Sequence, residues 1–157
     1  MNDRQFRTAM GSFATGVTVI TVEHNGDIHG MTANAFMSVS LDPKLVVISI
    51  REEATILNKI KESQNFTVNI LAADQQELSM YFAGQIKEPR EVVFDRLDGK
   101  PVLAGACAQV VCEVSTEHVE GDHILFIGKV TNIHLEDKEP LLYVNGKYHT
   151  LAGISTS

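Results

Sequence analysis

The segment from Gly30 to Ser40, GMTANAFMSVS, concentrates small and polar residues where the sequence otherwise alternates like a β-strand. Hydroxyl groups, an amide and bare backbone at this density suit hydrogen bonding to a flat heteroaromatic ring with many donors and acceptors. Glycine and alanine let such a ring approach the main chain closely. The alternative is a polar edge strand followed by a turn, and spacing alone favours that alternative.

A histidine at a tight turn is a second candidate. In Gly121-Asp122-His123 the aspartate could orient the imidazole within a cleft. The alternative is a solvated turn, in which aspartate favours the bend and glycine supplies a positive φ. Without further context, the residues favour the solvated turn.

A third, weaker candidate is the segment from Ser49 to Thr55, where a predicted strand leads into a predicted helix. Thr55 and the free backbone N–H groups of a helix start could meet a phosphate. Ordinary N-capping explains this segment equally well.

Familiar catalytic motifs are absent from the sequence. Gly11 and Gly16 have the spacing of P-loop glycines, but Val17 and Thr18 stand where lysine and serine or threonine are needed. There is no Gly-x-Gly-x-x-Gly, Gly-x-Ser-x-Gly, His-Glu-x-x-His or Cys-x-x-Cys. The six histidines are scattered without ligand spacing, so no metal site is expected.

Hydrophobic periodicity predicts a mainly β chain with few, short helices. We expect a first helix capped by Asp3 and ended by Gly16, whose stripe of Phe6, Met10 and Phe13 packs in the core. Asn-Gly pairs predict hairpin turns after residues 17–23 and around Asn145-Gly146. Further predictions are a strand from Ile28 to about Phe36, a polar bend over 38–43, a strand over 45–50 buried on both faces, a surface excursion over 85–100, and long strands over 106–118 and 123–136.

These strands do not alternate regularly with helices, which argues against a doubly wound parallel sheet. Mostly antiparallel strands around one core predict a closed or nearly closed barrel. The length of 157 residues indicates a single domain over 1–157.

Composition excludes several classes of protein. The net charge of −7, with no basic run longer than two residues, argues against nucleic acid as a partner. No apolar stretch is long enough for a signal peptide or a membrane span, so a cytoplasmic location is expected. Cys107 and Cys112 fall on one predicted strand, where they cannot form a disulfide with each other.

Five blocks together resemble the short-chain flavin reductases, the NAD(P)H:flavin oxidoreductase components of two-component aromatic monooxygenases. The blocks are Phe6–Thr21, Gly30–Pro43, Asn69–Leu71, Phe82–Gly84 and Gly121–Val130. The resemblance extends from about residue 3 to residue 151. The chain is similar to the reductase components of phenol 2-hydroxylase and 4-hydroxyphenylacetate 3-monooxygenase.

The resemblance implies an antiparallel Greek-key split β-barrel of the FMN-binding type, assembled as a homodimer with flavin near the subunit interface. It assigns the isoalloxazine edge to Thr32, Ala33 and Asn34, and the ring and ribityl chain to Ser38, Val39 and Ser40. It further implies a ribityl–phosphate path along Ser49, Ile50 and Thr55, a site closed by Phe82, Ala83 and Gly84, a nicotinamide facing His123, and a C-terminal pocket segment containing Tyr148 and His149.

The implied reaction is hydride transfer from NADH to FAD or FMN, which supplies reduced flavin to a separate oxygenase component. NADH is preferred to NADPH because the sequence has no obvious arginine cluster for a 2′-phosphate. Two alternatives remain: a flavin-binding carrier without catalysis, and an oxidase or ferric reductase that uses flavin on the same scaffold.

Overall fold

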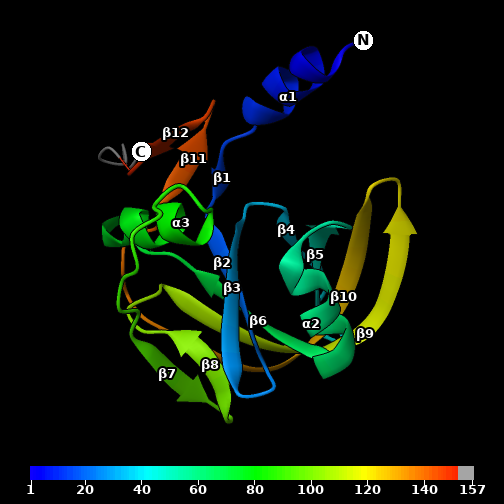
Figure 1. Ribbon diagram of the computed structural model, residues 1–157, viewed down its shortest axis with the longest axis vertical. Helices are drawn as coiled ribbons and strands as arrows, with labels where there is room; N and C mark the ends of the chain where they lie inside the picture. The colour runs from blue at the N-terminus through cyan, green and yellow to red at the C-terminus, as the bar shows by residue number, and fades with distance from the viewer. Residues whose placement is uncertain (152–157) are drawn as a thin grey trace.

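A computed structural model describes residues 1–151 as a mainly antiparallel β structure with short helices (Figure 1). The helices are α1 (Asp3–Gly11), α2 (Thr55–Ser63), the 3₁₀ turn η1 (Ala73–Gln75) and α3 (Gln76–Phe82). The strands are β1 (Thr15–Gly16), β2 (Thr18–His24), β3 (Asp27–Ala33), β4 (Phe36–Ser40), β5 (Leu45–Arg51), β6 (Asn65–Ile70), β7 (Phe94–Leu97), β8 (Lys100–Leu103), β9 (Ala108–Glu120), β10 (His123–Leu135), β11 (Leu142–Val144) and β12 (Lys147–His149).

Seven strands form the main sheet in the order β3-β2-β6-β9-β10-β5-β4, and every neighbouring pair is antiparallel. The two edge strands, β3 and β4, are consecutive in the chain and are joined by Asn34 and Ala35. The sheet therefore curls until its ends meet at this link. Within the described chain no ladder joins β3 to β4, so the predicted antiparallel β fold is confirmed but the barrel is not closed by hydrogen bonds.

The main core fills the inside of the curled sheet. Ile20, Ile48, Phe66 and Phe126 are completely or almost completely buried there, and α2 covers one end with Ile60. Burial alternates along β5, so only one of its faces is in the core. The prediction that this strand is buried on both faces was wrong, since its outer face is only half covered.

Two Asn-Gly pairs form the predicted hairpin turns. Asn25 and Gly26 have φ values of 52° and 82°, and Asn145 and Gly146 have 51° and 75°. Positive φ at both central residues is typical of a type I′ turn, which matches the twist of the strands it joins.

Helix α1 differs from its prediction. It ends at Gly11, and its N-cap is Asn2, whose side chain accepts a hydrogen bond from the Gln5 N–H at 2.8 Å. Phe6, Met10 and Phe13 are 52%, 56% and 77% exposed, so the predicted core packing of this stripe was wrong. Figure 1 shows why: the helix lies at one end of the molecule, away from the sheet. An apolar stripe predicts a buried face but does not identify what covers it.

Two further segments are more regular than predicted. The polar bend over 38–43 begins only after β4, whose residues pair with β5 as far as Ser40. The second half of the predicted excursion over 85–100 folds into the β7–β8 hairpin. Arg96 ties this hairpin to the body through two hydrogen bonds, of 2.7 and 3.0 Å, to the carboxylate of Glu23.

None of the helices in residues 1–151 has the length and apolar character that a membrane crossing requires. Cys107 lies just before β9, Cys112 lies within it, and both are free thiols.

Candidate active site

Five of the predicted site residues meet at one cavity of about 150 Å³ between β3, α3 and the β11–β12 hairpin. We call it the Thr32 cavity. Its lining comprises Val17, Thr32, Ala33, Asn34, Ser79, Ala83, Gln85, Tyr143 and Tyr148. The small and polar segment after Gly30 therefore lines a hollow at the seam of the sheet.

Hydrogen bonds fix the wall of the Thr32 cavity. The hydroxyl of Thr32 donates to the carbonyl oxygen of Ser79 at 2.6 Å, and the hydroxyls of Ser79 and Tyr148 lie 2.7 Å apart. The ring of Tyr148 also packs against Tyr143, with 5.1 Å between the ring centroids. Three elements distant in sequence are thus joined around one hollow.

Phe82 occupies a neighbouring position that explains the glycine in β3. A Cβ atom built on Gly30 would lie 2.6 Å from the Phe82 ring, closer than real side chains pack. The ring thus rests directly on the β3 backbone, while Ala83 reaches the cavity and Gly84, with φ of 77°, follows the end of the helix.

The residues predicted for the ring and ribityl chain lie on the outer face and edge of the sheet. Ser38 and Val39 are exposed on β4, and Ser40 is half-buried. Ser49 is half-buried on β5, and its N–H donates to the carbonyl of Ala35 at 3.3 Å. The side chain of Ile50 is completely buried in the core, and its backbone pairs with Ile124 of β10.

Thr55 is the first residue of α2, and Ala54 is the N-cap, without a side-chain capping bond. The Thr55 side chain is exposed and makes no hydrogen bond to any described residue. The N–H of Leu57 already donates to the carbonyl of Ala54 at 3.1 Å, so the Thr55 hydroxyl and the N–H groups of Thr55 and Ile56 are the donors left to meet an anion.

His123 begins β10, directly opposite Arg51 of β5. Its Nδ1 lies 2.7 Å from the Asp122 carboxylate, and this hydrogen bond holds the pKa of Asp122 below its ordinary value. Because an ionised carboxylate only accepts hydrogen bonds, Nδ1 carries the proton and Nε2 remains as an acceptor in the neutral ring. An imidazole oriented by Asp122 was one of the two alternatives that the sequence left open, and the sequence favoured the other, a solvated turn.

His123 opens into a second hollow, of about 440 Å³, between the β9–β10 turn and α1. We call it the His123 cavity. It is lined by Met1, Asn2, Asp3, Phe6, Arg7, Arg51, Asp122 and His123.

The structure does not bring all predicted residues into one pocket. His123 does not line the Thr32 cavity, and His149 lines a further hollow of about 330 Å³, which it shares with Tyr148. Register relates the first two hollows: Arg51 and Ser49 of β5 separate His123 from the β3–β4 link. Two strand spacings of about 4.8 Å across the sheet and two residues of about 3.3 Å along β5 make that separation about 12 Å.

Sequence reasoning missed several lining residues. Ser79 gives no local signal, since its role depends on the packing of α3 against β3 and β12. Tyr143 could have been found, because a hairpin turn at Asn145-Gly146 places it opposite Tyr148. Arg7 was overlooked because its neighbours across the His123 cavity are distant in sequence.

The donors of the Thr32 cavity fit a flat heteroaromatic ring such as an isoalloxazine. Asn34 and Gln85 present amides, the half-buried Ala33 adds only a methyl group, and Tyr148 adds an aromatic surface. The volume of about 150 Å³ is below the roughly 300–1,000 Å³ of small-molecule sites. One chain therefore offers a fitting edge for the ring but not a complete enclosure.

Comparison with known proteins agrees with this chemistry. The family described as flavin reductase like domain matches residues 10–152. An NADH-dependent flavin reductase from a Rhodococcus species is 43% identical over 148 residues, which cover 92% of this chain and 84% of the relative. The reductase component of 4-hydroxyphenylacetate 3-monooxygenase from Thermus thermophilus is 35% identical, with 93% and 95% covered.

Other relatives are named for NADH with FAD or with FMN. The solved structure of flavin reductase PheA2 in its native state superimposes with a TM-score of 0.96 at 59% identity, covering 98% of this chain and all of that one. Sequence similarity and fold thus agree over nearly the whole length, and the chain belongs to the flavin reductase-like domain family.

Proposed function

We propose that this protein is a single-domain NADH:flavin oxidoreductase that reduces FAD or FMN and supplies a separate oxygenase acting on a phenol or 4-hydroxyphenylacetate type of substrate. The observation that carries the proposal is the Thr32 cavity, whose amides, backbone and tyrosines match a flavin ring edge. The names of the relatives support NADH as the donor, with NADPH as the alternative, and support a partner oxygenase.

The bound cofactors would supply the chemistry, because hydride passes directly from the nicotinamide to the flavin ring. The protein then needs no nucleophile or metal, and its residues act by orientation. Thr32, Ala33 and Asn34 hold the ring edge. Ser38, Val39 and Ser40 contact the ring and ribityl chain, and Ser49, Ile50 and Thr55 lie along the path from the ribityl chain to the phosphate. Phe82, Ala83 and Gly84 close the site, and Tyr148 and His149 form its C-terminal wall.

His123 is the residue that we propose faces the nicotinamide. Asp122 fixes its Nδ1–H, which turns Nε2 toward solvent as an acceptor. In this role His123 positions the dihydronicotinamide and takes up no proton during the transfer.

A homodimer would complete the site. The stripe of Phe6, Met10 and Phe13 is uncovered, and Met37 and Val39 are exposed on the edge strand β4. A second copy covering these surfaces would also enclose the partly open Thr32 cavity. The test is the mass in solution by light scattering: Phe6→Ser/Met10→Ser should shift a dimer toward monomer, whereas an unchanged dimer contradicts this interface.

The activity is tested by following NADH absorbance with the purified protein and added FMN or FAD. The proposal predicts NADH oxidation that depends on both protein and flavin, and a visible spectrum then reports whether flavin co-purifies. Binding of flavin without NADH oxidation would support the carrier instead.

The two free thiols favour a reducing, cytoplasmic location for the reaction.

A further inference from the structure

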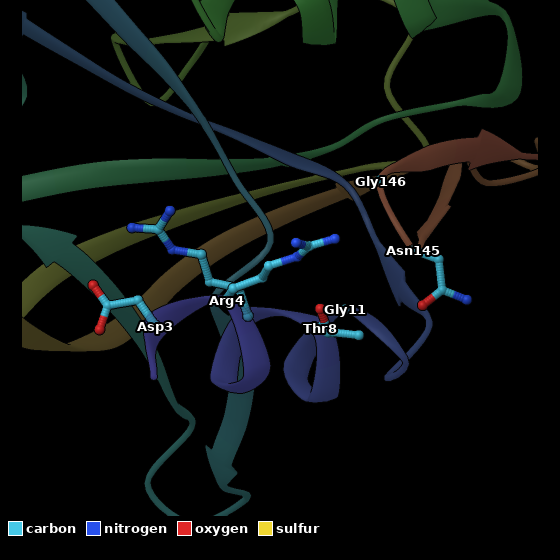
Figure 2. A pocket seen from close by; sticks show the side chains of 7 residues that line it. Asp3, Arg4, Thr8, Gly11, Asn145 and Gly146 are labelled. Carbon is cyan, nitrogen blue, oxygen red and sulfur yellow. The ribbon is translucent and has the colours of Figure 1, made fainter. Parts of the chain in front are cut away.

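A fourth hollow, of about 540 Å³, lies between α1 and the β11–β12 turn, outside every residue assigned above except those of α1 itself. We call it the Arg4 cleft. Figure 2 shows Arg4 and Thr8 on the helix on one side and Asn145 on the turn on the other. The full lining is Asp3, Arg4, Arg7, Thr8, Gly11, Asn145 and Gly146.

The cleft has a defined frame. The backbone N–H of Asn145 donates to the carbonyl of Gly11 at 2.8 Å, which ties the end of α1 to the turn. Gly146 leaves the opposite wall open, because it has no side chain. A backbone hydrogen bond thus fixes the two elements that flank the space beside Arg4.

Two guanidinium groups face this space without charged partners. Neither Arg4 nor Arg7 forms an ion pair with any residue in the described part of the chain, whereas Arg90 and Arg96 pair with Glu77 and Glu23. Arg4 and Arg7 lie three positions apart, so they share one face of α1. In a protein of net charge −7, two adjacent unpaired arginines favour an anionic ligand.

One acidic residue lines the same cleft. Asp3 occupies the first turn of α1, where the helix dipole favours a negative charge. It leaves the arginine pair with an excess of one positive charge within the cleft. Thr8 adds a hydroxyl donor on the same side of the helix.

The Arg4 cleft is continuous with the His123 cavity. Asp3 and Arg7 line both hollows, and Arg51 lies on the far side of the second one. A ligand whose reactive ring lies near His123 can therefore extend an anionic portion along Arg7 toward Arg4. Arginine suits this role because its planar donors bind phosphate oxygens in pairs.

We infer that Arg4 and Arg7 bind the diphosphate of an adenine dinucleotide whose nicotinamide or isoalloxazine ring is held at the His123 cavity or the Thr32 cavity. This inference rests on the proposed function, which requires one nicotinamide and one isoalloxazine ring. The same diphosphate occurs in NADH and in FAD, whereas FMN has a single phosphate and no adenylate. The source of the diphosphate is thus separable by experiment.

The direct test is calorimetric titration of the intact protein with ADP, a probe that carries the diphosphate but has no reactive ring and no 2′-phosphate. Because charge-assisted hydrogen bonds to phosphate are stronger than neutral ones, Arg4→Gln/Arg7→Gln should weaken ADP binding at least about tenfold. The matched control, Lys59→Gln/Lys87→Gln, removes the same charge at residues outside the cleft and should change the affinity for ADP less than about twofold.

Steady-state kinetics then identify the source. A higher KM for NADH with either flavin assigns the diphosphate to the nicotinamide dinucleotide. A higher KM for FAD with an unchanged KM for FMN assigns it to the flavin. Unchanged ADP affinity in the arginine variant, or unchanged KM for both NADH and FAD, overturns the inference.

The proposed function fails in a distinguishable way. If the unaltered protein oxidises no NADH with any flavin, the reductase assignment falls while ADP titration still tests the arginine pair. If NADH oxidation proceeds normally and the arginine variant binds ADP like the unaltered protein, only the Arg4 cleft assignment falls.

Discussion

The hydroxyl groups of Ser79 and Tyr148 lie 2.7 Å apart, and this contact joins helix α3 to strand β12 across the Thr32 cavity. Ser79 is completely buried, so loss of its partner would leave a polar group without compensation. Tyr148→Phe should therefore lower the free energy of unfolding by about 1–2 kcal/mol and weaken flavin binding. Chemical denaturation and flavin titration measure the two effects.

A double-mutant cycle separates the contact from other effects. Ser79→Ala/Tyr148→Phe should cost less than the sum of the single changes, because each single variant leaves one hydroxyl unpaired and the double variant leaves none. Strict additivity would mean that the two hydroxyls do not stabilise each other. Tyr81→Phe, on the same helix and outside the cavity lining, is the control.

Gly30 leaves room for the Phe82 ring to pack on the β3 backbone, because glycine has no side chain. Gly30→Ala places a methyl group 2.6 Å from that ring and should destabilise the fold by about 1–3 kcal/mol. Phe82→Leu in the same chain should recover part of the loss. Gly16→Ala is the matched control, since nothing lies within 4 Å of its Cβ position. Equal midpoints for Gly30→Ala and Gly16→Ala in denaturant would contradict this account.

The sequence predicted most of the strands because their periodicity is local. Asn25-Gly26 and Asn145-Gly146 identified two hairpins, since a type I′ turn requires the positive φ that these residues tolerate. The exposure of Phe6 could not be predicted, because an amphipathic helix gives no sign of whether its apolar face meets its own chain.

In the candidate site, too, sequence patterns predicted the residues that lie on one segment but not those that packing brings to it. Thr32, Ala33 and Asn34 form one continuous segment, and the structure places all three at one cavity. Ser79 and Gln85 join them only through the packing of α3 beside β3, which no local pattern encodes. The sequence also could not show that the outer face of β5 is only half covered, because an apolar run looks the same whether one face or both are buried.

His123 should affect nicotinamide binding more than flavin binding. His123→Ala removes one hydrogen-bonding group and is expected to raise the KM for NADH about three- to tenfold while the flavin affinity stays the same. His134→Ala, at an exposed histidine far along β10, should change neither. An unchanged rate and KM in His123→Ala would show that the histidine has no such role.

The Asp122 carboxyl provides a pH test of the same pair. Its folded pKa lies below the ordinary value of 3.8, chiefly because it accepts a hydrogen bond from His123. The stabilisation from this bond is present above the ordinary pKa and is lost as pH falls through the lower folded pKa. Carboxyl NMR titration of His123→Ala should show the Asp122 pKa moving back upward, and an unmoved pKa would exclude His123 as its cause.

The two thiols should react poorly with disulfide reagents in the folded protein. Burial raises the pKa of Cys112 to about 12 and also raises that of Cys107, so little thiolate forms at mildly alkaline pH. A colorimetric thiol assay should detect both groups promptly only after denaturation. Rapid labelling of Cys112 in the native protein would indicate that β9 opens locally.

Anaerobic reduction of flavin by NADH tests the central claim most directly, because without oxygen the electrons remain on the flavin. With a catalytic amount of the protein, the account predicts that the flavin absorbance bleaches, that one flavin is reduced for each NADH consumed, and that His123→Ala slows this at limiting NADH. Flavin that binds to the protein yet stays oxidised in the presence of NADH would contradict the account.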